Sequence, residues 1–191
     1  MEKETRYINN ITIRSTDEGR MIEGRAIVFN SDSRDMGFIE RIMPGAITED
    51  TINNSDIFLT FNHNQDAVLG RSNHGQGSLA IDVNENGVDF LCEAPNTSLG
   101  NDIVELLHRG DISSCSFAFT IPEEKGAERW YRDGDTLRRD INKIDHLYDL
   151  SVVTTPAYEA TTASARSLEM VKKVQDLDSQ YDDMLKELEE L

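Results

Sequence analysis

The chain has 191 residues and a mass of 21.6 kDa, enough for one domain with a full hydrophobic core and an appendage. Its 36 acidic and 19 basic residues give a formal net charge of −17 at pH 7, which disfavours nucleic-acid binding through phosphate contacts. No stretch approaches the ~20 apolar residues that a membrane span needs, and the first residues lack the apolar run of a secretory signal. We therefore expect a soluble, intracellular protein whose partners are proteins rather than nucleic acid or membrane.

The first half of the chain has the pattern of β-strands. Alternating apolar residues predict strands over residues 7–14 and 22–29, joined as a hairpin by the turn-forming segment between them. Pro44 interrupts the chain before AITEDTI, which predicts a short helix. The clearest hairpin is expected over residues 78–93, because the Asn-Gly pair near its centre supplies the positive φ angles of a tight turn.

The second half contains one strongly predicted helix. The segment TSLGNDIVELLHRG, residues 97–110, has capping residues at its start, one apolar face and a glycine at its exit. Residues 129–141 predict a hairpin around Asp133 and Gly134, and HLYDLSVV at residues 146–153 predicts a β-branched strand. Many strands and few helices favour a mainly β (α+β) fold closed into a barrel.

The pattern changes from residue 167 onward. Apolar residues recur there at alternating spacings of four and three: Met170, Val174, Leu177, Tyr181, Met184, Leu188 and Leu191. This stripe predicts a C-terminal amphipathic helix that is able to pair as a coiled coil with another copy or with a partner helix, or else to pack on its own domain. We divide the chain into a domain over residues 1–166 and a helix over residues 167–191.

Three polar segments contain candidate catalytic residues. FLTFNHN supplies His63 at the end of an apolar strand, SSCSFAFT supplies Ser116, and HLYDLSVVTTPAY supplies His146 and Asp149. A serine hydroxyl is a poor nucleophile unless an imidazole takes its proton, and the imidazole works best when a third group fixes its tautomer. A base, a nucleophile and an orienting group drawn from separate strands are what acyl transfer needs, so the sequence suggests a serine hydrolase.

The strand around Ser116 has two faces. Phe117 and Phe119 share one of them and are expected in the core, which leaves Ser116 on the other face with small neighbours. The two serines just before it are nearby rivals. Cys115 is another rival nucleophile, although a small buried apolar residue is its expected role. Neither Cys115 nor Cys92 lies at a metal-ligand spacing, and His63 with a single nearby aspartate cannot close a zinc site, so we expect no metal and no cofactor.

The orienting group has two candidates. In HLYDLSVV the two-residue period places His146 and Asp149 on opposite faces, so that both should not face the site. A carboxylate is able both to orient an imidazole and to stabilise the imidazolium. An oxyanion hole is also needed, and the arginines that are candidates to position its donors are Arg71, Arg138, Arg139 and Arg166.

Five motifs that include these segments occur in a recognisable order. They are GRAIVFNSDS at residues 24–33, FIERIMPGAI at 38–47, FNHNQDAVLGR at 61–71, SSCSFAFT at 113–120 and DLSVVTTPAY at 149–158. In this order and spacing, over roughly residues 6–166, the chain resembles the prohead (capsid maturation) serine proteases of tailed bacteriophages. The resemblance implies a fold similar to that of the herpesvirus assembly proteases, a closed β-barrel with surrounding helices.

The resemblance also implies roles for the candidate residues. The family pattern places the nucleophile immediately before the aromatic residue, which is Ser116 here, and the base in the segment of His63. It commonly has an acidic residue just before the SVV segment, where this chain has Asp149, although glutamate is frequent at that place. The herpesvirus enzymes use a second histidine instead, which keeps His146 as the alternative third member of the triad.

A serine endopeptidase of procapsid maturation is the function that the resemblance implies. Its substrates would be the scaffold segment of the major capsid protein and the protease itself, inside the procapsid in the host cytoplasm. The C-terminal stripe would support a homo-oligomer. The alternative is a capsid assembly or scaffold module that has lost catalysis and acts through its C-terminal helix, and the presence of His63 and Ser116 argues against it.

Overall fold

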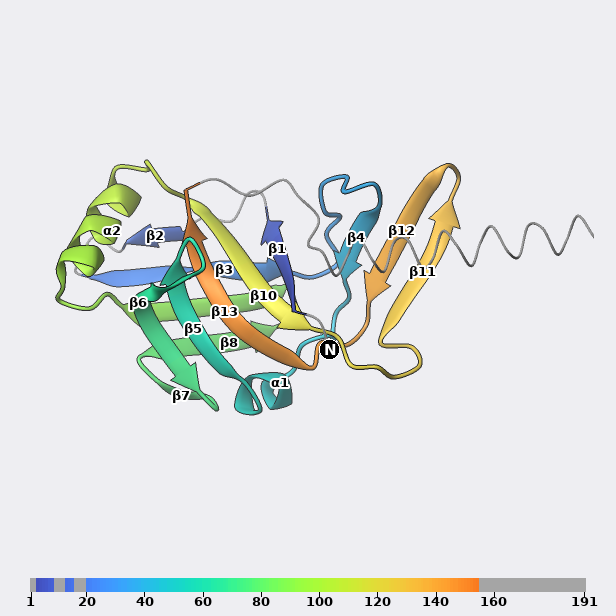
Figure 1. Ribbon diagram of the computed structural model, residues 1–191, viewed down its shortest axis with the longest axis horizontal. Helices are drawn as coiled ribbons and strands as arrows, with labels where there is room; N and C mark the ends of the chain where they lie inside the picture. Colours follow the sequence, from blue (N-terminus) through green and yellow to red (C-terminus); the bar gives the residue numbers. More distant parts are fainter. Residues whose placement is uncertain (1–2, 9–12, 16–19, 155–191) are drawn as a thin grey trace, which may run out of the picture. The chain divides into compact units, whose positions relative to one another are not determined.

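The structure, a computed structural model, describes residues 3–8, 13–15 and 20–154 of the chain. Within these residues the protein is mostly β, with two short helices (Figure 1). The strands are β1 (Glu4–Ile8), β2 (Ile13–Ser15), β3 (Met21–Val28), β4 (Ile39–Ile42), β5 (Asp56–Phe61), β6 (Asn64–Asn73), β7 (Gln76–Gly77), β8 (Leu79–Asn84), β9 (Gly87–Glu93), β10 (Ser114–Thr120), β11 (Glu128–Asp133), β12 (Thr136–Ile141) and β13 (His146–Val153). The helices are α1 (Glu49–Asn53) and α2 (Ser98–His108).

The strands form three sheets. The largest has six strands in the order β1-β10-β13-β5-β6-β7, the second has the order β2-β3-β9-β8, and the third has the order β11-β12-β4. Strands β10 and β13 are adjacent in the six-stranded sheet and pair antiparallel, whereas β13 and β5 pair in parallel. Segments that are far apart in the sequence therefore lie side by side in this sheet, as Figure 1 shows for β5, β10 and β13.

The hydrophobic core lies between the six-stranded and the four-stranded sheets. Leu59, Phe117 and Leu150 enter it from the first sheet, and Ile27 and Phe90 enter it from the second. All five are at most 4% exposed, and complete burial of a side chain of this kind stabilises the fold by about 1.5–3 kcal/mol. Because side chains of a strand alternate between faces, the opposite face of β5, β10 and β13 is left to the polar residues of these strands.

The expected closed barrel is wrong, because none of the three sheets closes on itself in the described residues. The six-stranded sheet ends at β1 on one side and at the two-residue strand β7 on the other, and the four-stranded sheet ends at β2 and β8. A barrel needs a ladder of hydrogen bonds that has no edge strand. The described chain instead buries its apolar surface by packing two open sheets face to face.

Of the surrounding helices that a barrel of this kind implied, the described residues contain only two short ones. Helix α1 has 5 residues and α2 has 11. Thr48 caps α1 and Thr97 caps α2, each through a side-chain oxygen that accepts a backbone N–H of the first turn, so both short helices occur where the sequence predicted them. The predicted C-terminal helix and the proposed boundary after residue 166 lie outside the described residues.

Two of the predicted hairpins are confirmed, β8 with β9 and β11 with β12. In the β8–β9 hairpin, glycine is required at position 87 because of a contact with another strand, which the sequence pattern did not indicate. A Cβ at Gly87 would collide with the carbonyl oxygen of Ile27 on the adjacent strand β3. Glycine is therefore needed there for close approach of two backbones as well as for its positive φ of 155°.

The N-terminal hairpin is only partly as predicted. Strand β2 pairs antiparallel with β3, with Ile13 opposite Gly24, as the sequence indicated. Strand β1 pairs instead with β10, with Tyr7 opposite Ser116. The single strand predicted over residues 7–14 is thus divided between two sheets, and its first part lies beside the candidate nucleophile.

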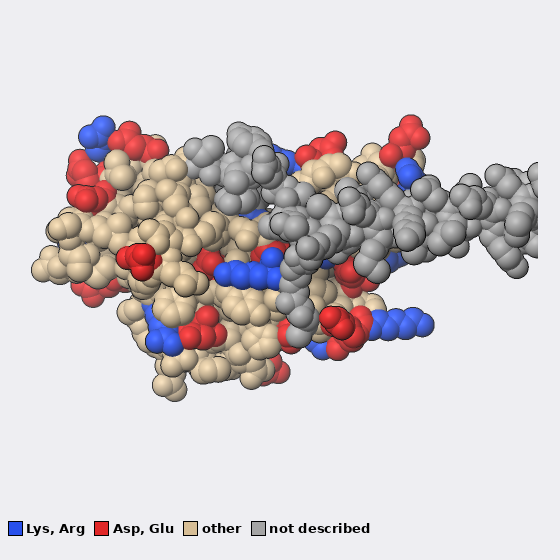
Figure 2. Space-filling view, viewed as in Figure 1, with Lys and Arg blue, Asp and Glu red and all other residues tan. Residues whose placement is uncertain are grey.

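Charge is distributed rather than concentrated on the face that Figure 2 shows. Acidic side chains occur there at several separate places, with basic ones among them and wide areas of neither. In the part of the chain that the structure describes, no helix is both long and apolar enough to cross a membrane.

Candidate active site

Ser116 lies in the middle of β10, on the face of the six-stranded sheet opposite the core. Phe117 and Phe119 point into the core and are 1% and 0% exposed, as the predicted alternation requires. Their ring centroids are 5.4 Å apart. Ser116 itself has no exposed surface, so its hydroxyl is surrounded by other groups of the protein.

A β-bulge in β13 determines the direction of Asp149. Ala118 of β10 pairs with Asp149, but the next residue of β10 pairs with Leu147. Tyr148 is therefore an extra residue in β13, and the strict alternation assumed from the sequence breaks at this point. Leu147 points into the core, while Asp149 points to the polar face. Bulges commonly re-aim one side chain in this way next to functional sites.

His63 lies in the turn between β5 and β6, just beyond the strand end where the sequence placed it. Phe61 pairs with Asn64, so Asn62 and His63 form a two-residue hairpin loop. Their φ angles are 52° and 56°, the left-handed values that a type I′ turn requires at both central residues. This conformation costs about 1–2 kcal/mol for a residue with a side chain, so contacts with the rest of the sheet must stabilise it.

Hydrogen bonds to β13 and to Thr154, the residue that follows it, supply that stabilisation. The N–H of Asn62 donates to the carbonyl oxygen of Val152 at 2.9 Å, the N–H of His63 donates to Ser151 Oγ at 2.8 Å, and the N–H of Thr154 donates to Asn62 Oδ1 at 3.0 Å. The turn is thus attached to the same strand that contains Asp149.

The imidazole of His63 lies between Ser116 and Asp149. Its Nε2 is 2.5 Å from Ser116 Oγ, and its Nδ1 is 2.6 Å from Asp149 Oδ1. A carboxylate at Nδ1 favours the tautomer with the proton on that nitrogen, which leaves Nε2 able to accept the serine proton. The side chains of His63 and Asp149 are only 22% and 10% exposed, so water screens their interaction weakly. The arrangement contains the hydroxyl, the base and the orienting acid that acyl transfer needs.

Two groups of the N-terminal segment also contact these residues. Ser116 Oγ is 2.8 Å from the carbonyl oxygen of Arg6, to which it can donate. Lys3 Nζ is 3.2 Å from Asp149 Oδ2 and 5.1 Å from the ring centroid of Tyr148. Asp149 therefore interacts with the imidazole through one oxygen and with an ammonium group through the other.

A buried set of charged residues, which we call the ion cluster, holds β1 beside the three-stranded sheet. It consists of Glu4, Arg6, Glu40, Glu128 and Arg139, and all but Glu128 are at most 5% exposed. Arg139 contacts Glu4 at 2.7 and 2.8 Å and Glu40 at 2.9 Å, and Arg6 contacts the same two glutamates. Burial opposes the charge on Arg6, but the negative charges of Glu40 and Glu4 raise its pKa above the usual value.

The rival nucleophile Cys115 points away from the site. It is 0% exposed and belongs to the core cluster. Burial raises the pKa of its thiol to about 12, so the nucleophilic thiolate is not formed at neutral pH.

The alternative orienting residue His146 lies at the other end of the strand pair. It is opposite Thr120, four residues along β10 from Ser116, which corresponds to about 13 Å of extended strand. Its Nδ1 is 2.7 Å from Asp145 Oδ2. The structure therefore brings His63, Ser116 and Asp149 together and places His146 elsewhere.

The candidate arginines are engaged in ion pairs. Arg71 pairs with Asp56 through two hydrogen bonds of 2.7 and 2.6 Å, and Arg138 pairs with Asp32 and Asp133. Arg139 belongs to the ion cluster, and Arg166 lies outside the described residues. These carboxylate partners account for the positions of the three described arginines without a role at Ser116.

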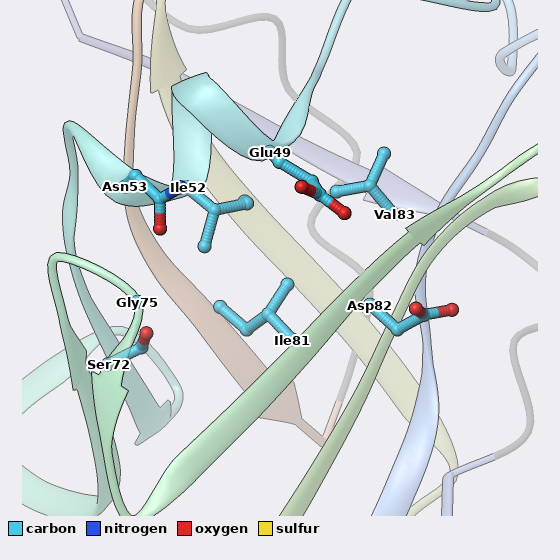
Figure 3. A pocket seen from close by; sticks show the side chains of 8 residues that line it. All are labelled: Glu49, Ile52, Asn53, Ser72, Gly75, Ile81, Asp82 and Val83. Atoms are coloured by element: carbon cyan, nitrogen blue, oxygen red, sulfur yellow. The ribbon is translucent and has the colours of Figure 1, made fainter.

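A pocket of about 150 Å³ lies apart from the three residues that the structure brings together. It is formed by α1, β6, β8 and the β6–β7 turn, and its lining residues are Glu49, Ile52, Asn53, Ser72, Gly75, Ile81, Asp82 and Val83. The side chains of Ile52 and Ile81 extend into the space between α1 and β8 (Figure 3). None of His63, Ser116 and Asp149 lines it.

Sequence reasoning missed Ser151, whose hydroxyl is completely buried and accepts the N–H of His63. The two-residue period did place Ser151 on the same face as Asp149. A serine within an apolar strand nevertheless gives no indication of its partner, because that partner is a backbone group 88 residues away in the chain.

Comparison with known families agrees with the resemblance drawn from the motifs. A family model described as caudovirus prohead serine protease matches residues 9–174, which is most of the chain and includes His63, Ser116 and Asp149. No match was found among curated proteins or among solved structures. The chain therefore belongs to the caudovirus prohead serine protease family, the serine peptidases of phage capsid maturation.

Proposed function

We propose that this protein is a serine endopeptidase in which Ser116, His63 and Asp149 form the catalytic triad. Its substrates are the scaffold segment of the major capsid protein and the protease itself, and it acts inside the procapsid in the host cytoplasm. Family membership supports the peptidase chemistry and the capsid substrates. The observation that carries the triad is the pair of distances from the two ring nitrogens of His63, 2.5 Å to Ser116 Oγ and 2.6 Å to Asp149 Oδ1.

In the first half of the reaction, Ser116 Oγ attacks the carbonyl carbon of the scissile peptide bond while Nε2 of His63 takes the hydroxyl proton. The C–N bond of the tetrahedral intermediate then breaks, and His63 gives the same proton to the leaving amine. The products of this half are an acyl-enzyme on Ser116 and the released amine fragment.

In the second half, water replaces the amine. His63 takes a proton from the water molecule, whose oxygen attacks the acyl carbon, and the proton returns to Ser116 Oγ as the ester bond breaks. Asp149 accepts a hydrogen bond from Nδ1 in both halves and stabilises the imidazolium that forms each time.

Substrate access requires a local rearrangement in this proposal, because Ser116 has no exposed surface. A substrate carbonyl must replace one of the groups around the hydroxyl. The carbonyl oxygen of Arg6, at 2.8 Å, is the peptide group that already lies next to Ser116 Oγ. We therefore expect the contact between β1 and Ser116 to loosen when a substrate binds.

The decisive experiment compares Ser116→Ala with Ser114→Ala, a control two residues earlier on the same strand. Both variants are co-expressed with the major capsid protein, and processing is followed by the mass of the capsid protein. Each purified variant is also treated with a fluorophosphonate probe, which labels an activated serine covalently. We expect Ser116→Ala to lose both processing and labelling, and Ser114→Ala to retain both.

Processing by Ser116→Ala would contradict the triad. If the wild-type protein neither labels nor processes but still assembles with capsid protein, the non-catalytic assembly role is the better account. The predicted C-terminal stripe, which lies outside the described residues, supports recruitment to the scaffold or to a second copy in either case, because a/d positions of an amphipathic helix need an apolar partner.

A further inference from the structure

Ser151 occupies a central position among the three strands of the site. On β13 it stands opposite Ser116 of β10 and Thr60 of β5, and Asp149 is two residues earlier on the same strand. It has no exposed surface. Its side chain thus lies between the proposed nucleophile and the strand that leads into the turn of His63.

The hydroxyl of Ser151 uses its full hydrogen-bonding capacity, which is one donor and two acceptor positions. Its oxygen accepts the N–H of His63 at 2.8 Å and the hydroxyl of Thr60 at 3.1 Å. Its own proton can be donated to the carbonyl oxygen of Thr60 at 3.2 Å or to that of Val152 at 3.4 Å. One buried hydroxyl therefore connects β13, β5 and the backbone of the turn that follows β5.

The position of the imidazole depends on that backbone. His63 has a positive φ, and its ring must place one nitrogen near a residue of β10 and the other near a residue of β13. Hydrogen bonds keep their strength only over a narrow range of distance and angle, so a small displacement of the turn weakens both contacts. The bond to Ser151 is made by the N–H of His63 itself.

We propose that Ser151 is a positioning residue for the catalytic base. Its hydroxyl fixes the backbone of His63 against β13, so that the imidazole meets Asp149 of that strand and Ser116 of the next. This inference rests on the proposed triad. Ser151 is not a second nucleophile, because it contacts the backbone N–H of His63 and not the imidazole.

The test uses three variants of the full chain. Ser151→Ala removes the acceptor of the His63 N–H with little change in volume, and Ser151→Thr restores a hydroxyl at the same place. Thr60→Val is the matched control, because it removes a buried hydroxyl from the same group of contacts and leaves the bond between Ser151 and His63 in place. Folding of each variant is checked by chemical unfolding.

Two measurements separate positioning from a purely structural role. The first is the second-order rate of reaction with a fluorophosphonate probe between about pH 5 and 9, the range in which an imidazole changes its protonation. The second is the NMR spectrum of protein with ¹⁵N-labelled histidine, in which the ring nitrogens of His63 report their hydrogen bonds to Ser116 and Asp149.

We expect Ser151→Ala to react about 100-fold more slowly, the effect of misplacing a catalytic group by about 1 Å. The ring signals of His63 should shift or broaden in this variant. Thr60→Val should react at close to the wild-type rate, and Ser151→Thr should recover most of the lost rate. If Ser151→Ala does not fold, Ser151→Cys replaces it, since a thiol is a weak acceptor, and the same loss of rate is expected.

A wild-type rate in a folded Ser151→Ala or Ser151→Cys variant would overturn the inference, as would an equal loss in Thr60→Val. Failure of the triad itself is recognised separately. Labelling of Ser116→Ala by the probe would contradict the proposed triad, because Ser116 would not be the nucleophile. If Ser116→Ala is not labelled but Ser151→Ala reacts at the wild-type rate, the triad stands and only the positioning role of Ser151 is wrong.

Discussion

Ser116 and Asp149 lie on neighbouring antiparallel strands, on the same face and two positions apart, because Ser116 pairs with Ser151 and Asp149 pairs with Ala118. Diagonal neighbours of this kind are about 7–8 Å apart, a separation that an imidazole ring spans with a hydrogen bond at each end. His63 fills this gap from the turn that follows β5, the strand next to β13 in the sheet. The geometry of the site is therefore set by the register of one strand pair and by the attachment of one hairpin.

The first prediction separates the two candidates for the orienting residue. Asp149→Asn should lower turnover by about 10²–10⁴-fold. A neutral amide does not stabilise the imidazolium of His63, and it no longer favours the tautomer with the proton on Nδ1. His146→Ala should leave turnover nearly unchanged, since His146 contacts Asp145 instead. The turnover of each variant is measured by processing of co-expressed capsid protein and by probe labelling. The opposite ranking in folded variants would assign the orienting role to His146.

The second prediction concerns the pH dependence of Cys115. Burial raises the pKa of its thiol to about 12, above the value of an unfolded chain. The neutral thiol therefore contributes stability that is fully present below the unfolded pKa and is lost as the pH rises toward 12. Native protein should resist alkylation of Cys115 by iodoacetamide at pH 8–9, where an exposed cysteine near its usual pKa of about 8.5 reacts.

Cys115→Ala provides the functional half of the same test. It should retain most of the peptidase activity, because the side chain lies in the core rather than at His63. Loss of activity in a folded Cys115→Ala variant, together with rapid alkylation of the native protein, would make the enzyme a cysteine peptidase.

The third prediction concerns the ion cluster. Arg139→Met should lower the free energy of unfolding by about 3–5 kcal/mol, because the buried carboxylates of Glu4 and Glu40 each lose a charged partner. Arg25→Met is the control. It removes an arginine from a pair with Asp89 whose side chains are 37% and 35% exposed, and it should change stability little. Equal effects of the two substitutions on urea unfolding would show that burial of the cluster is unimportant.

The fourth prediction rests on the sequence of the tail alone. If the a/d stripe pairs with another copy or with a scaffold helix, replacing Leu177 and Leu188 by Asp should weaken that association, since a buried a/d position does not accept an unpaired charge. Gln175 and Ser179 lie at the b and f positions opposite the stripe, so their replacement by Asp adds the same charge as a control. Sedimentation equilibrium measures self-association, and incorporation into procapsids measures recruitment. Unchanged results for both pairs would leave the stripe without a role in partnership.

The local elements of the fold were largely predictable, because their signals lie within a few residues. Pro44 marked the approach to α1, capping residues marked the start of α2, and the alternation around Phe117 and Phe119 placed Ser116 on the correct face. The closure of the sheets was not predictable in this way. Whether the first and last strands of a sheet pair to close a barrel depends on contacts between residues far apart in the sequence. The division of β1 and β2 between two sheets likewise has no local sequence signal.

The position of His146 shows why periodicity alone does not describe the site. Strict alternation placed His146 and Asp149 on opposite faces. The bulge at Tyr148 shifts the register, so that His146 pairs with Thr120 and Asp149 pairs with Ala118, two residues apart on β10. Both therefore belong to the same face, and it is distance along the strand that separates His146 from Ser116. A bulge adds one residue without changing the composition, so the sequence pattern does not indicate it.

The hydroxyl of Ser116 has one proton and two acceptors within reach, Nε2 of His63 and the carbonyl oxygen of Arg6. It can donate to only one of them at a time. In the proposed mechanism, proton transfer to His63 starts from the first orientation, so a hydroxyl that donates to Arg6 must turn before it reacts. Because Glu4 and Arg6 of β1 belong to the ion cluster, residues of β4 and β12 help to hold in place the carbonyl group that competes with His63 for this proton.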